Sequence, residues 1–87
     1  IEGNIDTYGN LRIEGKVLGN IKCKTKVALG ESSLIEGNIV AQNAEIAGEV
    51  KGTVEVSDIL SLKSTANING DIVTGKLIVE AGAVWNG

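Results

Sequence analysis

The stretch IEGNIV at residues 35–40 contains the unit that repeats along this chain: a glycine, one polar residue, and then isoleucine or valine. Five glycines begin such a unit, at spacings of 16, 18, 15 and 18 residues: Gly3, Gly19, Gly37, Gly52 and Gly70. Gly87 would begin a sixth unit after 17 more residues. The repeats fill residues 1–87 as one domain and leave no room for a linker.

Between successive glycines, apolar residues alternate with polar ones, which indicates strands with one buried side. In the third repeat the expected inward positions are Ile39, Ala41, Ala44, Ile46, Gly48 and Val50. Each repeat therefore predicts three short strands and three corners. A helix is disfavoured because each interior glycine would cost about 1 kcal/mol. An antiparallel sandwich has no reason to repeat with a period near 17. We expect an all-β, three-sided parallel β-helix of about five turns, here called rungs, stacked about 4.8 Å apart.

The repeated glycine is expected to turn the backbone at one corner of each rung. Glycine adopts positive φ without a Cβ penalty, so the five glycines above are predicted to be structural. A phosphate-binding role is disfavoured because no Walker pattern and no glycine motif before a helix is present. Asn4, Asn20 and Asn38 follow the first three of these glycines, and their stacked amides are predicted to hydrogen-bond as a ladder.

Composition argues against catalysis, cofactors and nucleic-acid binding. The formal charge is −3, with no histidine and one cysteine, so the chain lacks a basic surface for nucleic acid and a histidine-containing metal cluster. Left-handed β-helical acyltransferases, the main enzymes near this period, use a histidine base. Cys23 falls at an inward position and is interpreted as a small buried hydrophobe. Lys22, Lys24 and Lys26 alternate along one strand and are interpreted as solvating its outer face.

The ends of the solenoid are predicted to be apolar, because neither terminal rung shows a polar cap. The last rung would offer four side chains to a docking molecule: Ile72, Leu77, Val79 and Trp85. The first rung would likewise offer Ile5, Leu11, Ile13 and Val17. Trp85 could close the core, contact another molecule, or do both. Outward apolar residues at Val40, Val73 and Ile78 suggest lateral contacts.

Three segments together resemble the central domain of bactofilins, the bacterial polymer-forming cytoskeletal proteins. They are LRIEGKVLGNI (11–21), VALGESSLIEGNIVAQNAEIAGEVKGTVE (27–55) and STANINGDIVTGKLIVEAGAVWNG (64–87). The resemblance implies a right-handed, three-sided β-helix that polymerises end to end without nucleotide, in the cytoplasm and often at the inner membrane. Trp85 falls where the family tends to place an aromatic residue in its last rung. The family's short tails, one of which can bind membranes, have no counterpart in these residues.

The sequence therefore predicts a structural protein rather than an enzyme, with no cofactor. Its expected partner is itself, in a homopolymer that serves as a scaffold for cell shape or protein localisation. Contacts with the membrane or with cell-wall-related proteins would run through the missing tails. The alternatives are a monomeric β-helical binding scaffold and, less favoured, an enzyme resembling the left-handed β-helical acyltransferases.

Overall fold

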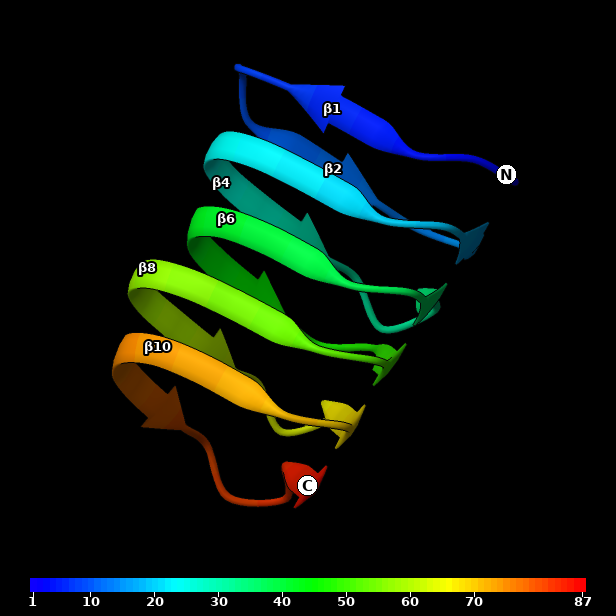
Figure 1. Ribbon diagram of the computed structural model, residues 1–87. Helices are drawn as coiled ribbons and strands as arrows, with labels where there is room; N and C mark the ends of the chain where they lie inside the picture. Colours follow the sequence, from blue (N-terminus) through cyan, green and yellow to red (C-terminus); the bar gives the residue numbers. More distant parts are fainter.

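The computed structural model describes residues 1–87, and all of its regular secondary structure is strand. Every pair of neighbouring strands is parallel. In Figure 1 the near strands run from right to left, the chain turns to the back at the left edge, and each turn lies below the one before it, which is a right-handed coil. The predicted parallel β-helix is confirmed, together with the handedness that the resemblance implied.

Two sheets form the three sides of the coil. The first and second sides belong to a six-stranded sheet of β1 (Ile5–Thr7), β2 (Leu11–Ile13), β4 (Ile21–Leu29), β6 (Ile39–Ile46), β8 (Val54–Leu62) and β10 (Ile72–Val79). The third side is a five-stranded sheet of β3 (Lys16–Leu18), β5 (Leu34–Glu36), β7 (Glu49–Lys51), β9 (Asn67–Asn69) and β11 (Val84–Asn86).

The corner between the first and second sides differs from the prediction of three separate strands. From β4 onward a single strand passes through this corner, and the register shifts there, between Cys23 and Lys26 in β4 and between Ala41 and Asn43 in β6. No residue at this corner has a positive φ. The chain bends through a β-bulge, which lets the strand continue with little loss of pairing. Only the first rung breaks here, into β1 and β2.

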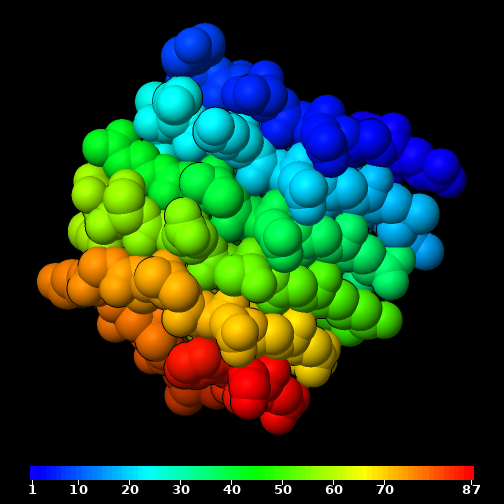
Figure 2. Space-filling view, in the orientation of Figure 1, coloured from blue at the N-terminus to red at the C-terminus, as the bar shows by residue number.

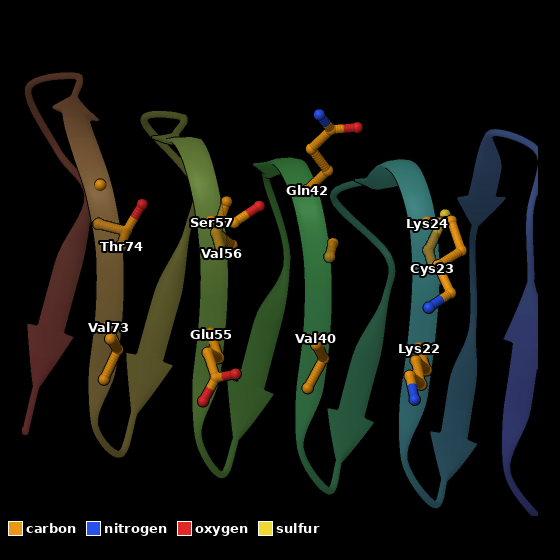
Figure 3. Close-up of a pocket in the computed structure, with 12 residues that line it drawn as sticks. Lys22, Cys23, Lys24, Val40, Gln42, Glu55, Val56, Ser57, Val73 and Thr74 are labelled. Carbon is orange, nitrogen blue, oxygen red and sulfur yellow. The ribbon is translucent and has the colours of Figure 1, made fainter.

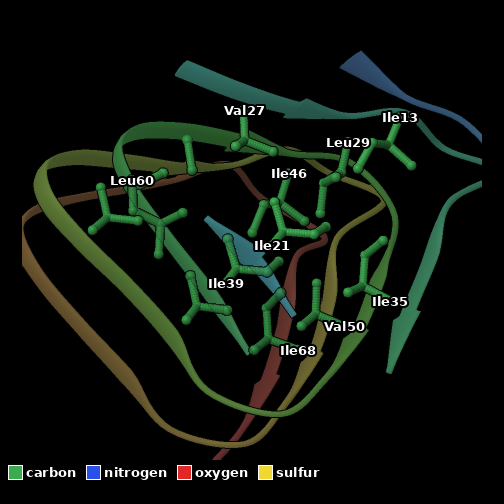
Figure 4. Packing of buried hydrophobic residues seen from close by; sticks show 14 of the residues in the cluster. Ile13, Ile21, Val27, Leu29, Ile35, Ile39, Ile46, Val50, Leu60 and Ile68 are labelled. Atoms are coloured by element: carbon green, nitrogen blue, oxygen red, sulfur yellow. The ribbon is translucent and has the colours of Figure 1, made fainter. Parts of the chain in front are cut away.

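The core consists of columns in which apolar side chains stack like on like. One column of register partners runs Ile5, Ile21, Ile39, Val54 and Ile72, and another runs Val17, Ile35, Val50, Ile68 and Trp85. Figure 4 shows inner members of both columns, Ile21 and Ile39 from the first and Ile35, Val50 and Ile68 from the second, gathered inside the triangular cross-section. The buried cluster has 18 residues, and the inward positions predicted from the alternation form its columns.

The corner between the third side and the next first side depends on glycine. All five predicted corner glycines have positive φ, from 123° at Gly3 to 153° at Gly37. A Cβ built on Gly37 would overlap the backbone carbonyl of Gly19, and a Cβ on Gly19 would overlap that of Gly3. Positive φ and close approach together account for glycine at four of the five corners, and positive φ alone accounts for it at Gly3.

The asparagines after these glycines bind the backbone, so the predicted amide-to-amide ladder is wrong. Asn4 Oδ1 accepts a hydrogen bond from the backbone N–H of Asn20 at 2.9 Å, and Asn20 Oδ1 accepts one from that of Asn38 at 2.9 Å. Asn38 Oδ1 likewise accepts a hydrogen bond from the backbone N–H of Thr53 at 3.1 Å. These N–H groups lie at the corner, outside the strand ladder, and a side-chain oxygen satisfies them.

Partly exposed ion pairs connect four rungs along the second side and its corner with the third side. Glu45 lies between Lys26 at 3.7 Å and Lys63 at 3.0 Å, and Lys63 also approaches Glu80 at 3.5 Å. The Lys63 hydrogen bond holds the pKa of the Glu45 carboxyl below its ordinary value, although partial burial opposes this shift. Glu45 in turn raises the pKa of Lys63, with a further contribution from Glu80.

Gly37→Ala is expected to destabilise the fold by about 3 kcal/mol or more, because strain at positive φ, about 1 to 3 kcal/mol, adds to the overlap with the Gly19 carbonyl. Gly9→Ala is the matched control: a Cβ there meets nothing within 4 Å, and Gly9 is not among the positive-φ glycines. Urea denaturation followed by circular dichroism measures both. Equal losses for the two variants would contradict the role assigned to the corner.

Lys63→Gln is expected to raise the pKa of Glu45 toward its ordinary value, because it removes the largest cause of the lowering. A carboxyl with a lowered folded pKa contributes stability above its unfolded pKa and loses that contribution as pH falls through the folded pKa. The variant should therefore lose less stability on acidification than the parent does. Carboxyl carbon NMR titration gives the pKa, and Lys51→Gln, on the third side, should leave it unchanged.

Candidate functional site: the terminal rungs

The last rung exposes positions that are buried in every inner rung. Leu62 is 1% exposed, whereas its register partner Val79 in β10 is 53% exposed. Ile68 is fully buried, whereas its partner Trp85 in β11 is 48% exposed. The columns simply end here, because no further rung covers them. Figure 2 shows this rung as the orange and red band at the lower end of the stack.

The structure places all four predicted C-terminal residues at this end. Leu77, Val79 and Trp85 are exposed there, and Ile72 is partly buried against the core. Trp85 is held in place, because its indole Nε1 donates a hydrogen bond to the Gly70 carbonyl at 2.8 Å. The ring is therefore fixed by the corner glycine while about half of its surface stays free. That Trp85 contacts another molecule stays a prediction.

The first rung offers less apolar surface than predicted. Ile13 and Val17 are only 6% and 1% exposed, so two of the four residues predicted for this end are already buried within the single chain. Ile5 and Leu11 are partly buried. The physical reason at Val17 is that residues 1–2 add part of a further third side: Glu2 bridges Leu18, and the Leu18 N–H donates to the Ile1 carbonyl at 2.8 Å.

Two exposed apolar residues at the ends of the solenoid were missed by sequence reasoning. Ile1, 78% exposed, lies one rung above Val17 in the same column, as the Glu2–Leu18 bridge implies. The alignment of residues 1–3 with residues 35–37 could have revealed it, since both stretches read IEG. Val84, outward on β11, is also exposed. With Val73 and Ile78 it makes the outer surface of the last rung apolar as well.

Cys23 lies in the core, as predicted. It is 3% exposed, and its Sγ lies 3.2 Å from the Gly9 carbonyl oxygen and 3.6 Å from the Lys26 carbonyl oxygen. The thiol fills the inward column between Thr7 and Ala41. No three side chains of histidine, cysteine, aspartate or glutamate group closely enough to hold a metal ion.

Residues 1–87 match a protein-family model described as "Bactofilin: Polymer-forming cytoskeletal". The chain belongs to the bactofilin family. Bactofilin BacO from Myxococcus xanthus (strain DK1622) is 36% identical over 87 residues, which are all of this chain and 69% of the relative. Bactofilin BacP from the same organism is 24% identical, over 36% of its own length. The resemblance predicted from the sequence is confirmed.

A solved bactofilin structure shares the fold. The crystal structure of a mutant bactofilin from Thermus thermophilus matches with a TM-score of 0.85 at 29% identity, over 91% of this chain and 90% of the other. The five-rung β-helix of this bactofilin is thus the family's fold, and the family's cytoskeletal description makes it a structural protein. No helix here is long and apolar enough to cross a membrane.

Proposed function

We propose that this bactofilin polymerises end to end through its terminal rungs, and that the resulting filament is a scaffold for cell shape or protein localisation. The observation that carries the proposal is the exposure of Leu77, Val79 and Trp85 at register positions that inner rungs bury completely or nearly so. The polymer-forming description of the family supports it.

The inner rungs show what an end contact can contribute. Each rung pairs its backbone with the next through a parallel ladder and buries its inward side chains against the same columns. The lower edge of β10 keeps backbone groups that a further strand could pair, and an exposed edge of this kind is a template for another chain. Burying a large aliphatic side chain contributes about 1.5 to 3 kcal/mol when it starts fully exposed. A docking copy would therefore gain both backbone pairing and apolar burial.

The two ends do not contribute equally. The C-terminal end presents three exposed inward-column side chains, whereas the N-terminal end presents Ile1 with the partly buried Ile5 and Leu11. Ile13 and Val17 already lie inside the single chain. The C-terminal end is thus the stronger candidate for the primary contact, and substitutions there should have the larger effect.

We propose further that assembly needs no nucleotide or other cofactor and that the protein catalyses no reaction. The glycines lie at corners between strands, where their φ and close approach account for them, rather than before a helix that could hold phosphate. Cytoplasmic localisation, with association at the inner membrane, is proposed from the family resemblance. Contacts with membrane or cell-wall-related proteins would depend on tails outside residues 1–87.

Trp85→Arg is expected to abolish long filaments while leaving a folded, strand-rich particle, because a charge would be placed in the apolar end contact. Leu77→Asp should act in the same way. Electron microscopy and pelleting report filaments, and circular dichroism reports the fold. Glu31→Arg, at an exposed corner in the second rung, is the control and should still polymerise. Unchanged filaments in both end variants would remove this end from the interface.

Filament formation is expected to be the same with and without ATP or GTP, because no phosphate site is proposed. Pelleting of the purified protein over a concentration series tests this, with and without added nucleotide. A requirement for nucleotide would contradict the cofactor-free proposal. Monomers under every condition would contradict polymerisation and favour a monomeric binding scaffold.

A further inference from the structure

The outer surface of the first side carries an ordered pattern of charge that the fold does not require. Lys22, Val40 and Glu55 are register partners on the neighbouring strands β4, β6 and β8, so they form one outward column with one residue in each of three successive rungs. Asp6 and Val73 extend this column to the first and last rungs. Figure 3 shows Lys22, Val40, Glu55 and Val73 lined up across four neighbouring strands on the same surface.

A second set of exposed polar residues lies beside this column, at the bulged corner, and repeats the pattern. Lys24 lies in the second rung, Gln42 in the third, and Ser57 with Asp58 in the fourth. Gln42 Nε2 donates a hydrogen bond to Asp58 Oδ2 at 3.2 Å. Residues of the first column and of this second set, among them Lys22, Val40 and Gln42, line an open groove of about 740 Å³, the largest on the molecule. This surface is therefore basic in the second rung, neutral in the third and acidic in the fourth.

Such a pattern is complementary to itself in one orientation. A two-fold axis through the third rung, perpendicular to the solenoid axis, brings Val40 against Val40 of a second copy. The same axis brings Lys22 against Glu55 of the other copy, twice, and Lys24 toward Ser57 and Asp58. A parallel arrangement at the same level would instead oppose lysine to lysine. Such a contact is isologous: both copies use the same surface, so it forms a closed dimer.

We propose that this surface, the first-side face, binds a second copy of the chain in antiparallel orientation, with Val40 at the centre and Lys22–Glu55 pairs on both sides. The occupant follows from charge complementarity between the face and itself. The face has Val40 and Val73 exposed by 38% and 59%, which gives the contact an apolar component. It lies on the flank of the solenoid, so it is separate from the end contact and does not depend on it.

The contact is expected to be weak in a single pair and effective in a polymer. Exposed ion pairs contribute at most about 1 kcal/mol each, and salt screens them. Along two filaments the contact would recur at every subunit, and repeated weak contacts strengthen one another through effective concentration. The face would thus pair filaments side by side through antiparallel subunits, and higher salt would separate the pairs.

The decisive test exchanges charges between copies, in a Trp85→Arg background that removes the proposed end contact. Lys22→Glu alone and Glu55→Lys alone should each weaken the dimer by at least about tenfold, since each turns two attractive pairs into repulsive ones. Mixing the two single variants should restore it, because each glutamate then meets a lysine. The double variant should also dimerise. Sedimentation velocity at low and high salt measures the association.

Lys51→Glu and Glu31→Lys are the controls, since they make the same charge changes away from the first-side face. They should leave dimerisation unchanged, alone or mixed. Equal weakening by the controls, or no recovery on mixing, would overturn the proposal.

Cross-linking tests the geometry separately, and also works if the end variant still forms filaments. In a Cys23→Ala background, Val40→Cys should give a disulfide-linked dimer on oxidation, because the two-fold axis brings the two cysteines together. Val73→Cys, which is more exposed, should not, because it faces Asp6 of the partner copy. Efficient cross-linking of Val73→Cys, or none of Val40→Cys, would overturn the antiparallel contact. If Trp85→Arg leaves the filaments unchanged while Val40→Cys still cross-links, the proposed end contact is refuted and the first-side contact is supported.

Discussion

The structure depends on one steric constraint, repeated at one corner of every rung. The carbonyl of each corner glycine points at the next glycine and occupies the space that a Cβ would need. Positive φ at these positions adds a second restriction. Together they fix the position at which the chain finishes one rung and begins the next. That position sets the register of all three sides, so every inward residue lies over its counterpart in the rung above.

The same constraint explains why the ends of the solenoid are chemically different from its middle. Nothing within a column of stacked apolar residues prevents a further rung from stacking on it. The last rung here repeats the inward apolar pattern with Leu77, Val79 and Trp85. A compact globule can close its core, whereas a stack can only cover it with a cap or with another molecule. The exposed end is therefore a direct consequence of the fold, and the end-to-end polymerisation proposed above would cover it.

The features that repeat could be predicted from the sequence alone, because a pattern that recurs in every rung is distinguishable from a chance match. The five corner glycines and the inward columns were both predictable from a period and an alternation. What was missed depends on single contacts. The burial of Val17 depends on two residues of a partial rung, and the asparagine bonds depend on which backbone N–H groups the corner leaves unpaired. The continuous strand through the bulged corner was missed because alternation cannot distinguish a bend from a break.

Outward residues are free of the constraint that fixes the inward columns. Any polar residue would solvate the first side, so stacking does not explain why positive charge lies in the second rung and negative charge in the fourth. Like charges stacked in one column would repel, which favours some alternation of sign, but neutral residues between rungs would serve equally well. The charges of the second to fourth rungs, which are antisymmetric about Val40, satisfy a stricter condition, because they complement their own two-fold image. The outward columns are therefore expected to determine lateral contacts. The inward columns determine folding and are expected to determine the end contacts.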